Sequence, residues 1–305
     1  MRSSSRILII GFGDIGERVA RQLVSRYLVT ALVRNAESAR RARMLGVHAL
    51  RGDLSLPDSL RKLAGNADVV FHFAPPPSEG VRDTHTRHLL AALARQSMGK
   101  SMRSGMLSQR LPRRLVYIST TGVYGDCGGD WIDESRAVKP ATERARRRVD
   151  AENVLRCWGR RHEVTVSILR APGIYAADRL PVERLRKGIA ALSVDDDVFT
   201  NHIHAEDLAR AAIAAMHRGK AGRIYNVVDD STLPMGDYFD RVADAFGLTR
   251  PPRISRAEAE TRLSPALISF MSESRRIHNH RLKRELRFKL RYPTVDDFLR
   301  ELKCG

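Results

Sequence analysis

Three glycines near the N-terminus have the type and spacing that phosphate binding requires, in Gly11-Phe12-Gly13-Asp14-Ile15-Gly16. The apolar run before them, residues 7–10, is typical of a buried strand, and the residues after them have the apolar period of a helix. In such a strand–turn–helix unit the first glycine makes the tight turn. The second lets backbone N–H groups approach a pyrophosphate, and the third lets helix and strand pack closely. Since a helix N-terminus also favours negative charge, the motif predicts a dinucleotide site, against the alternative of a glycine-rich turn without a ligand.

The residues after the second and third expected strands bear on which dinucleotide would bind. An acid that bonds the 2′-hydroxyl of NAD is usual after the second strand. Here residues 31–35 contain no carboxylate, and Arg34 can pair with a 2′-phosphate instead. We therefore expect NADP(H), with NAD(H) as second choice; an ordinary surface cation is the alternative for Arg34. Asp53, in Arg51-Gly52-Asp53-Leu54, follows the third strand, where its carboxylate can meet the adenine amino group or cap a helix.

The apolar patterns alternate between strands and helices through residue 170, which predicts βαβ units, a parallel sheet and an α/β, Rossmann-type doubly wound fold. We expect a dinucleotide-binding domain over residues 1–170 and a smaller mixed substrate lobe over 171–305, with 224–228 returning to the main sheet. Residues 97–113 lack periodicity and are expected to form a surface loop. The expected strands are 6–10, 28–33, 47–50, 68–74, 114–119 and 164–169, and the expected helices include 36–45, 82–97 and 142–159.

Composition narrows the class of protein. The chain has 305 residues, 43% of them hydrophobic, and its 53 Lys and Arg against 35 Asp and Glu leave a net charge of +18. This charge is spread along the chain without a nucleic-acid-binding motif, so we expect a solvated basic surface or an anionic small-molecule ligand and no specific nucleic acid partner. No apolar run reaches the roughly 18 residues that a membrane helix needs. The three cysteines are scattered, so we expect neither a disulfide framework nor a metal site. We expect a cytoplasmic location.

Several motifs together resemble a known family. The glycine motif, Gly52-Asp53, Phe73-Ala74 and the segment Tyr117-Ile-Ser-Thr-Thr-Gly-Val-Tyr-Gly125 are similar to those of extended short-chain dehydrogenases/reductases, specifically the NAD(P)-dependent epimerase/dehydratase group. Residues 170–175 and 201–208 match later segments of that group, so the resemblance covers about residues 6–230. It implies an oxidoreductase or epimerase, a cofactor contact at Ala74, and a monomer or homodimer.

The resemblance also assigns substrate contacts. A Ser or Thr four residues before the tyrosine of the Val-Tyr-Gly segment bonds the substrate oxygen in the family, and here it is Thr120. The 4,6-dehydratases have Asp-Glu next, whereas this chain has Thr121-Gly122, so a sugar-nucleotide dehydratase is not expected. Thr121, Tyr175 and Arg281 are expected near an anionic, possibly nucleotide-sugar-like substrate.

The chain departs from the family at the Tyr-x-x-x-Lys pair of the following helix. With Glu152 as the anchor, these positions hold Arg144 and Arg148. At about 100° per residue, the two arginines share a face with Ala151 and Leu155, while Arg146, Arg147, Asp150 and Asn153 point elsewhere. We expect the pair to face a buried anion; snorkelling along an apolar stripe is the alternative.

Arginine changes the chemistry at this point, because it stays protonated and cannot act as a base near neutral pH. It can instead stabilise an oxyanion or hold a carboxylate or phosphate. Tyr124 and Tyr175 are substitute proton donors, with a packing role as the alternative for each. Two functions therefore stay open: an NADP(H)-dependent oxidoreductase or epimerase, and a catalytically inactive NADP(H)-binding sensor or scaffold.

Overall fold

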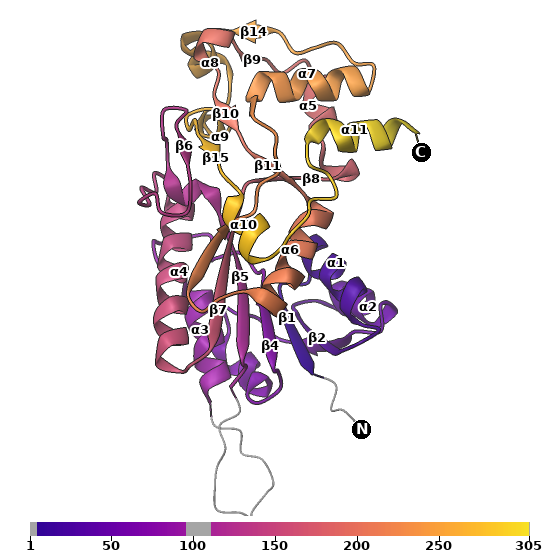
Figure 1. Ribbon diagram of the computed structural model, residues 1–305, viewed down its shortest axis with the longest axis vertical. Coiled ribbons are helices and arrows are strands. Elements are labelled where there is room, and N and C mark those ends of the chain that lie inside the picture. Colours follow the sequence, from indigo (N-terminus) through magenta and orange to yellow (C-terminus); the bar gives the residue numbers. More distant parts are fainter. Residues whose placement is uncertain (1–4, 96–110, 305) are drawn as a thin grey trace, which may run out of the picture.

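The computed structural model describes residues 5–95 and 111–304. Seven parallel strands form one sheet in the order β12-β7-β5-β4-β1-β2-β3 (Figure 1). The chain moves outward from β1 to β3 on one side and from β4 onward on the other, so the order reverses between β1 and β4, where α/β sheets bind their ligands. The expected Rossmann-type doubly wound fold is confirmed. The strands are β1 Arg6–Ile10, β2 Leu28–Val33, β3 His48–Arg51, β4 Val69–His72, β5 Arg114–Thr120, β7 Thr165–Ala171 and β12 Arg223–Asn226.

Helices cover both faces of the sheet. One face packs against α1 Asp14–Leu23, α2 Ala36–Met44, α6 Ala205–Arg218 and α10 His280–Glu285. The other packs against η1 Pro57–Leu63, α3 Thr84–Ala94 and α4 Glu143–Arg161. Because successive side chains of a strand point to opposite faces, Ile7 and Ile9 enter the first core and Leu8 and Ile10 the second.

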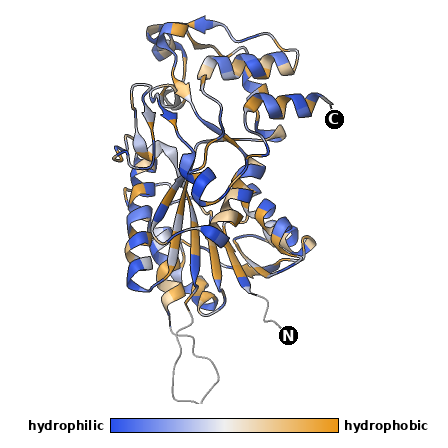
Figure 2. Ribbon diagram, viewed as in Figure 1, coloured by the Kyte–Doolittle hydropathy of each residue, from blue (hydrophilic) through white to orange (hydrophobic). Residues whose placement is uncertain are grey.

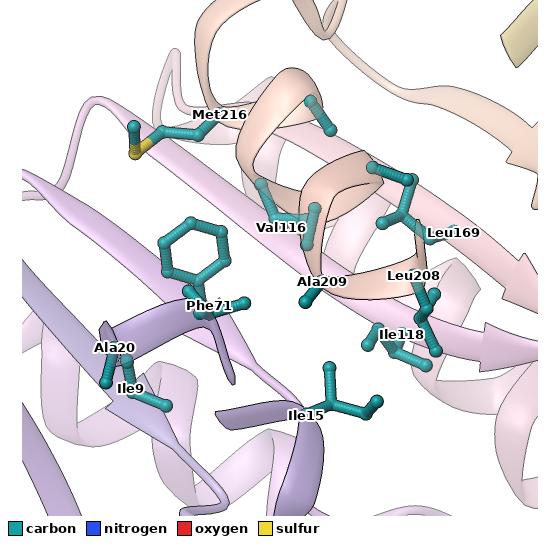
Figure 3. Packing of buried hydrophobic residues seen from close by; sticks show 14 of the residues in the cluster. Ile9, Ile15, Ala20, Phe71, Val116, Ile118, Leu169, Leu208, Ala209 and Met216 are labelled. Atoms are coloured by element: carbon teal, nitrogen blue, oxygen red, sulfur yellow. The ribbon is translucent and has the colours of Figure 1, made fainter. Parts of the chain in front are cut away.

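Figure 3 shows part of the first of these cores, which includes Ile9 and Phe71 from the strands, Ala20 of α1, and Leu208 and Ala209 of α6. In Figure 2 hydrophobic residues gather along the strands, whereas α4 carries many hydrophilic ones. A strand buried on both faces must be apolar at nearly every position, which explains the uninterrupted run Ile7 to Ile10.

A smaller lobe lies over one end of the sheet (Figure 1). It has its own apolar core around Tyr238, Phe239 and Phe298. Its strands pair in two-stranded sheets, β10 with β13, β11 with β8, β14 with β9 and β15 with β6. These and the connecting elements are η2 Thr121–Tyr124, β6 Trp131–Ile132, β8 Gly173–Tyr175, η3 Ala177–Arg179, α5 Val182–Arg186, β9 Ala191–Leu192, η4 Val194–Asp196, β10 Phe199–Thr200, β11 His202–His204, β13 Leu233–Pro234, α7 Met235–Ala245, β14 Arg253–Ile254, α8 Arg256–Arg262, α9 Pro265–Phe270, β15 Arg276–Ile277 and α11 Val295–Cys304.

The expected elements agree with the structure to within a few residues at each boundary. The expected return of 224–228 to the main sheet is seen as β12, and α6 also belongs to the sheet layer, although both follow residue 170. The division at residue 170 stays a prediction. Most of the expected surface loop, residues 97–110, lies outside the described residues. None of the helices within 5–95 and 111–304 is long and apolar enough to cross a membrane.

Candidate functional site

The glycine motif forms the expected turn between β1 and α1. Gly11 has φ +95°, and a Cβ there would lie 2.5 Å from the backbone N of Ala74. A Cβ on Gly16 would lie 2.5 Å from the carbonyl oxygen of Gly11. A Cβ on Gly13 meets no atom within 4 Å. Packing therefore requires the first and third glycines, whereas the second leaves open space beside the backbone.

The open space at Gly13 fits a dinucleotide pyrophosphate. No side chain caps the N-terminus of α1, so its first N–H groups have no side-chain acceptor and are available to phosphate oxygens. A cavity of about 310 Å³ lies here, within the size range of small-molecule sites. The expected cofactor residues that line it are Gly11, Phe12, Gly13, Arg34, Asp53, Leu54 and Ala74.

The other three residues of the glycine motif do not line the first cavity. Ile15 is buried in the core, and Gly16 packs against the turn. Asp14 is engaged in ion pairs, at 2.7 Å from Arg18 Nε and at 3.3 Å from Arg179 Nη2. They shape the turn and are not lining residues of the cavity.

The far end of the cavity is basic. Arg34 is exposed and makes no side-chain hydrogen bond or ion pair within the described residues. Arg41 lines the same cavity, and its Nε lies 2.7 Å from Glu17 Oε1. The sequence reasoning missed Arg41 and its neighbour Ser38. A usable signal was present, because Asn35 caps α2 and places Ser38 and Arg41 one turn apart on it.

Asp53 lines the first cavity, and its contact with an adenine stays a prediction. It does not cap η1, whose N-cap residue is Leu56 and has no side-chain cap bond. The Asp53 carboxylate accepts hydrogen bonds from the backbone N (2.8 Å) and the hydroxyl (2.7 Å) of Ser55, which stabilises the turn before η1. These bonds, with a smaller contribution from Arg34, hold the pKa of Asp53 below its usual value. The ionised carboxylate thus lines the cavity as an acceptor.

A second cavity, of about 460 Å³, lies at the carboxyl ends of β5 and β7 beneath the smaller lobe. The expected residues Thr120, Thr121 and Arg144 all line it. Thr120 caps η2, its Oγ1 accepting the backbone N–H of Gly122 at 3.2 Å. The lobe contributes, among others, Arg179, Phe199, Asn201, Ser269, Glu273 and Arg275.

Arg144 lies exposed at this cavity without a carboxylate within ion-pair distance among the described residues. Desolvation lowers its pKa, and the positive charges of Arg148 and Arg147 lower it further. An anion in the cavity would relieve this repulsion, so Arg144 has the surroundings expected of an anion ligand.

Arg148 corrects the sequence expectation. Its side chain is buried, and Nη1 donates to the Tyr117 hydroxyl (2.9 Å) and to the carbonyl of Ile118 (2.8 Å), away from the second cavity. Arg147, expected to point elsewhere, is also buried and donates to the carbonyl of Gly80. The reason is that α4 contacts β5, β7, η2 and α3, so its buried face is wider than one stripe.

Three further expected residues lie outside both cavities. The Tyr124 hydroxyl donates to Asn226 Oδ1 at 2.7 Å, and burial raises the pKa of Tyr124. Tyr175 is buried in the core of the smaller lobe. Arg281 donates to the carbonyl of Ile224 at 3.0 Å. All three therefore have packing or bridging surroundings.

The histidines of the segment 201–208 have a structural setting. His204 caps α6, with Nδ1 accepting the N–H of Glu206 at 3.2 Å, and burial lowers its pKa to about 4. Within the described ranges, no group of three or more His, Cys, Asp or Glu side chains is placed to hold a metal ion.

A parallel sheet with this order and a glycine turn between β1 and α1 define a dinucleotide-binding Rossmann protein, which here carries a smaller lobe over one end of the sheet. The model of the NAD dependent epimerase/dehydratase family matches residues 7–228, and the chain belongs to this family. The resemblance seen in the sequence is thereby confirmed.

Curated relatives are distant. A ketoreductase of Stigmatella aurantiaca that acts on 4-hydroxy-2-methyl-3-oxo-4-farnesyl-3,4-dihydroquinoline-1-oxide is 24% identical, covering 78% of this chain and 72% of that protein. The trifunctional UDP-glucose 4,6-dehydratase/UDP-4-keto-6-deoxy-D-glucose 3,5-epimerase/UDP-4-keto-L-rhamnose-reductase of Arabidopsis thaliana is 23% identical over 45% of this chain. The chain spans only 22% of the length of that enzyme.

Solved structures agree with the fold along the whole chain. A functionally unknown conserved protein from Silicibacter pomeroyi DSS has a TM-score of 0.78 at 28% identity, covering 99% of both chains. The UDP-glucose 4-epimerase of Thermotoga maritima, solved with UDP-glucose, has a TM-score of 0.75 at 15% identity and covers 96% of both chains.

Proposed function

We propose that this protein is an NADP(H)-preferring oxidoreductase or epimerase that acts on a small anionic substrate. One observation carries the proposal: Thr120 and Arg144 line one cavity at the same edge of the sheet as the glycine turn. A nicotinamide dinucleotide, when bound, takes up or returns a hydride. A substrate with a carbonyl or alcohol and a charged group needs a hydroxyl that donates to its oxygen and a cation that pairs with its charge, and Thr120 and Arg144 can supply these.

Thr120 and Arg144 have different proposed contacts with the substrate. The Thr120 hydroxyl can hold the substrate oxygen, and the Arg144 guanidinium can pair with a carboxylate or phosphate through parallel N–H donors. Nucleotide sugars carry such a phosphate. One structural neighbour was solved with UDP-glucose, and the name of one curated relative includes UDP-glucose as the compound it acts on. Both observations support this class of substrate.

The preference for NADP(H) rests on the basic end of the first cavity. Arg34 has no ion-pair partner among the described residues, and Arg41 lies on the same wall. Either guanidinium can pair with a 2′-phosphate, while the carboxylate that would favour NAD(H) is missing at the end of β2.

A second function, NADP(H) binding without turnover, is favoured by one observation. The two positions of the family's proton-transfer pair hold arginines, and Arg148 is hydrogen-bonded to the Tyr117 hydroxyl and the Ile118 carbonyl. Such a protein would bind both ligands and transfer no hydride.

Binding and turnover separate the two functions. NADP(H) and NAD(H) are titrated first by cofactor fluorescence, and UDP by calorimetry. Cofactor reduction is then followed with UDP-glucose and other anionic secondary alcohols. We expect Arg144→Ala to weaken UDP binding roughly tenfold, as for loss of one charge-assisted bond. Arg146→Ala, on the exposed side of α4, is the matched control. Binding of UDP that is unchanged in Arg144→Ala would contradict the proposed anion site.

A further inference from the structure

The second cavity has one carboxylate among the described residues that line it. The other polar side chains of this lining are three arginines, which cannot act as bases near neutral pH, and threonine, serine and asparagine. Among the described residues that line it there is no histidine, cysteine, lysine or tyrosine. The one carboxylate of this described lining is Glu273, whose side chain is just 16% exposed.

Backbone contacts hold Glu273 in place from two sides. The neighbouring Ser274 donates its N–H to Asp126 Oδ1 at 2.8 Å, and its carbonyl accepts the N–H groups of Cys127 and Gly129, each at 3.0 Å. On the other side, the Ser274 hydroxyl accepts the N–H of Phe199 at 3.0 Å. The segment 273–275 is thus fixed between the loop after η2 and β10.

Arg275 ties the Glu273 carboxylate to the C-terminal end of η2. Its Nη1 lies 2.7 Å from Glu273 Oε2 and 2.7 Å from the carbonyl oxygen of Gly125. Gly125 ends η2, which Thr120 caps. A single guanidinium therefore connects the carboxylate with the turn that carries the Thr120 hydroxyl.

We propose that Glu273 is the proton acceptor and donor of the reaction, an inference that rests on the proposed function. In the oxidative direction the substrate O–H bond breaks and its proton passes to a Glu273 carboxylate oxygen. The electron pair of the adjacent C–H bond leaves as hydride to the oxidised nicotinamide, and the C=O bond forms. In the reductive direction the protonated carboxyl returns the proton to the substrate oxygen, which Thr120 holds. Glu273 thus takes the task that Arg144 and Arg148 cannot perform.

The charges around Glu273 are mostly positive. Arg275 on its own segment pairs with it, Arg144 of α4 and Arg179 of η3 face the same cavity, and Asp126 contacts the neighbouring Ser274. The carboxylate therefore lies among cations from three different segments of the chain.

The test compares Glu273→Gln and Glu273→Asp in the full chain loaded with NADP, using UDP-glucose and a panel of anionic secondary alcohols for turnover. Glutamine keeps the shape and an acceptor for Arg275 but cannot take a proton. We expect Glu273→Gln to lower turnover about 10²–10⁴-fold and to abolish the acidic limb of the pH profile. Glu273→Asp should keep that limb and part of the rate. Glu260→Gln, on the exposed side of α8, is the control and should change neither.

Binding of UDP provides a readout independent of turnover. Because a negative charge leaves the cavity, Glu273→Gln should bind UDP several-fold more tightly than wild type, and this also shows that the variant folds. Unchanged turnover and pH profile in Glu273→Gln would overturn the proposal while leaving the proposed function intact. A wild type that binds UDP and NADP but reduces no cofactor with any alcohol of the panel would overturn both.

Discussion

Arg144 and Arg148 lie one helical turn apart on α4, yet only Arg144 reaches the second cavity. Arg148 is 7% exposed and donates to the Tyr117 hydroxyl and the Ile118 carbonyl inside the sheet layer. The two arginines therefore have different surroundings. Arg148 is hydrogen-bonded to β5, whereas the Arg144 side chain lines the second cavity.

The different surroundings of Arg144 and Arg148 predict different effects for their two alanine variants. Arg148→Ala removes the donor of a buried hydroxyl and a buried carbonyl, so it should lower the free energy of unfolding by about 1–3 kcal/mol. Arg144→Ala should change stability by less than about 0.5 kcal/mol, as for most surface substitutions, but weaken UDP binding. Urea unfolding and calorimetry measure the two quantities. Equal destabilisation by both variants would contradict the assigned roles.

Rebuilding the family pair gives a second prediction. Arg144→Tyr combined with Arg148→Lys restores the family residue types but removes the anion ligand. Binding of UDP should therefore weaken as in Arg144→Ala, and native turnover should not simply improve. Tighter UDP binding in the double variant would show that Arg144 holds no anion.

The glycines predict a contrast between folding and binding. A Cβ on Gly16 would lie 2.5 Å from the Gly11 carbonyl oxygen, so Gly16→Ala should destabilise the fold. Gly13→Ala meets no protein atom within 4 Å, so it should fold with nearly unchanged Tm and lose affinity for NADP(H). Thermal unfolding and cofactor titration distinguish the two. Full NADP(H) affinity in Gly13→Ala would mean that the pyrophosphate does not approach this residue.

Cofactor preference should depend on Arg34. Loss of one charge-assisted bond to a 2′-phosphate corresponds to about 1.5–3 kcal/mol, or roughly tenfold or more in affinity. Arg34→Ala should thus weaken NADP(H) binding by this factor and leave NAD(H) binding nearly unchanged. Arg40→Ala, on an exposed position of α2, is the control. A preference for NAD(H) in the wild type would refute the expectation.

Stability should fall with rising pH because of Asp229. Burial raises the pKa of this carboxyl to about 8, above its unfolded value, so the folded protein holds a proton that the unfolded chain releases. Its contribution is therefore complete at acidic pH and is lost as pH rises toward about 8. Burial lowers the pKa of His72 and His202 to about 3, and their effect is confined to pH below about 6.5.

Urea midpoints between pH 6.5 and 8 test this point, since Asp229 should dominate the slope there. Asp229→Asn should flatten the slope and make the protein more stable than wild type at the upper end. Asp195→Asn, at an exposed position of η4, is the control and should keep the wild-type slope. An unchanged slope in Asp229→Asn would show that another group controls the pH dependence.

The sequence by itself determined the features that depend on local geometry. The glycine turn, the buried strands and the alternation of elements are properties of short segments, because φ, hydrophobic period and capping act over a few residues. They were sufficient for the Rossmann-type fold and for most of the residues that line the first cavity. Thr120, Arg144 and Arg148 were singled out by the resemblance to the family, and Thr120 and Arg144 line the second cavity. Helix periodicity did not give the direction of Arg148, since the contacts of α4 with several partners widen its buried face.

Only the tertiary structure decided which distant residues share the second cavity. Glu273 and Arg275 lie about 150 residues beyond Thr120 and come to it through backbone hydrogen bonds of Ser274 to Asp126, Cys127 and Gly129. No periodicity or motif marks Glu273 in the sequence, because its surroundings are supplied by the loop after η2 and by β10. A carboxylate becomes a candidate proton acceptor only when packing places it in the same cavity as the other proposed substrate contacts, and that placement is a property of the folded chain.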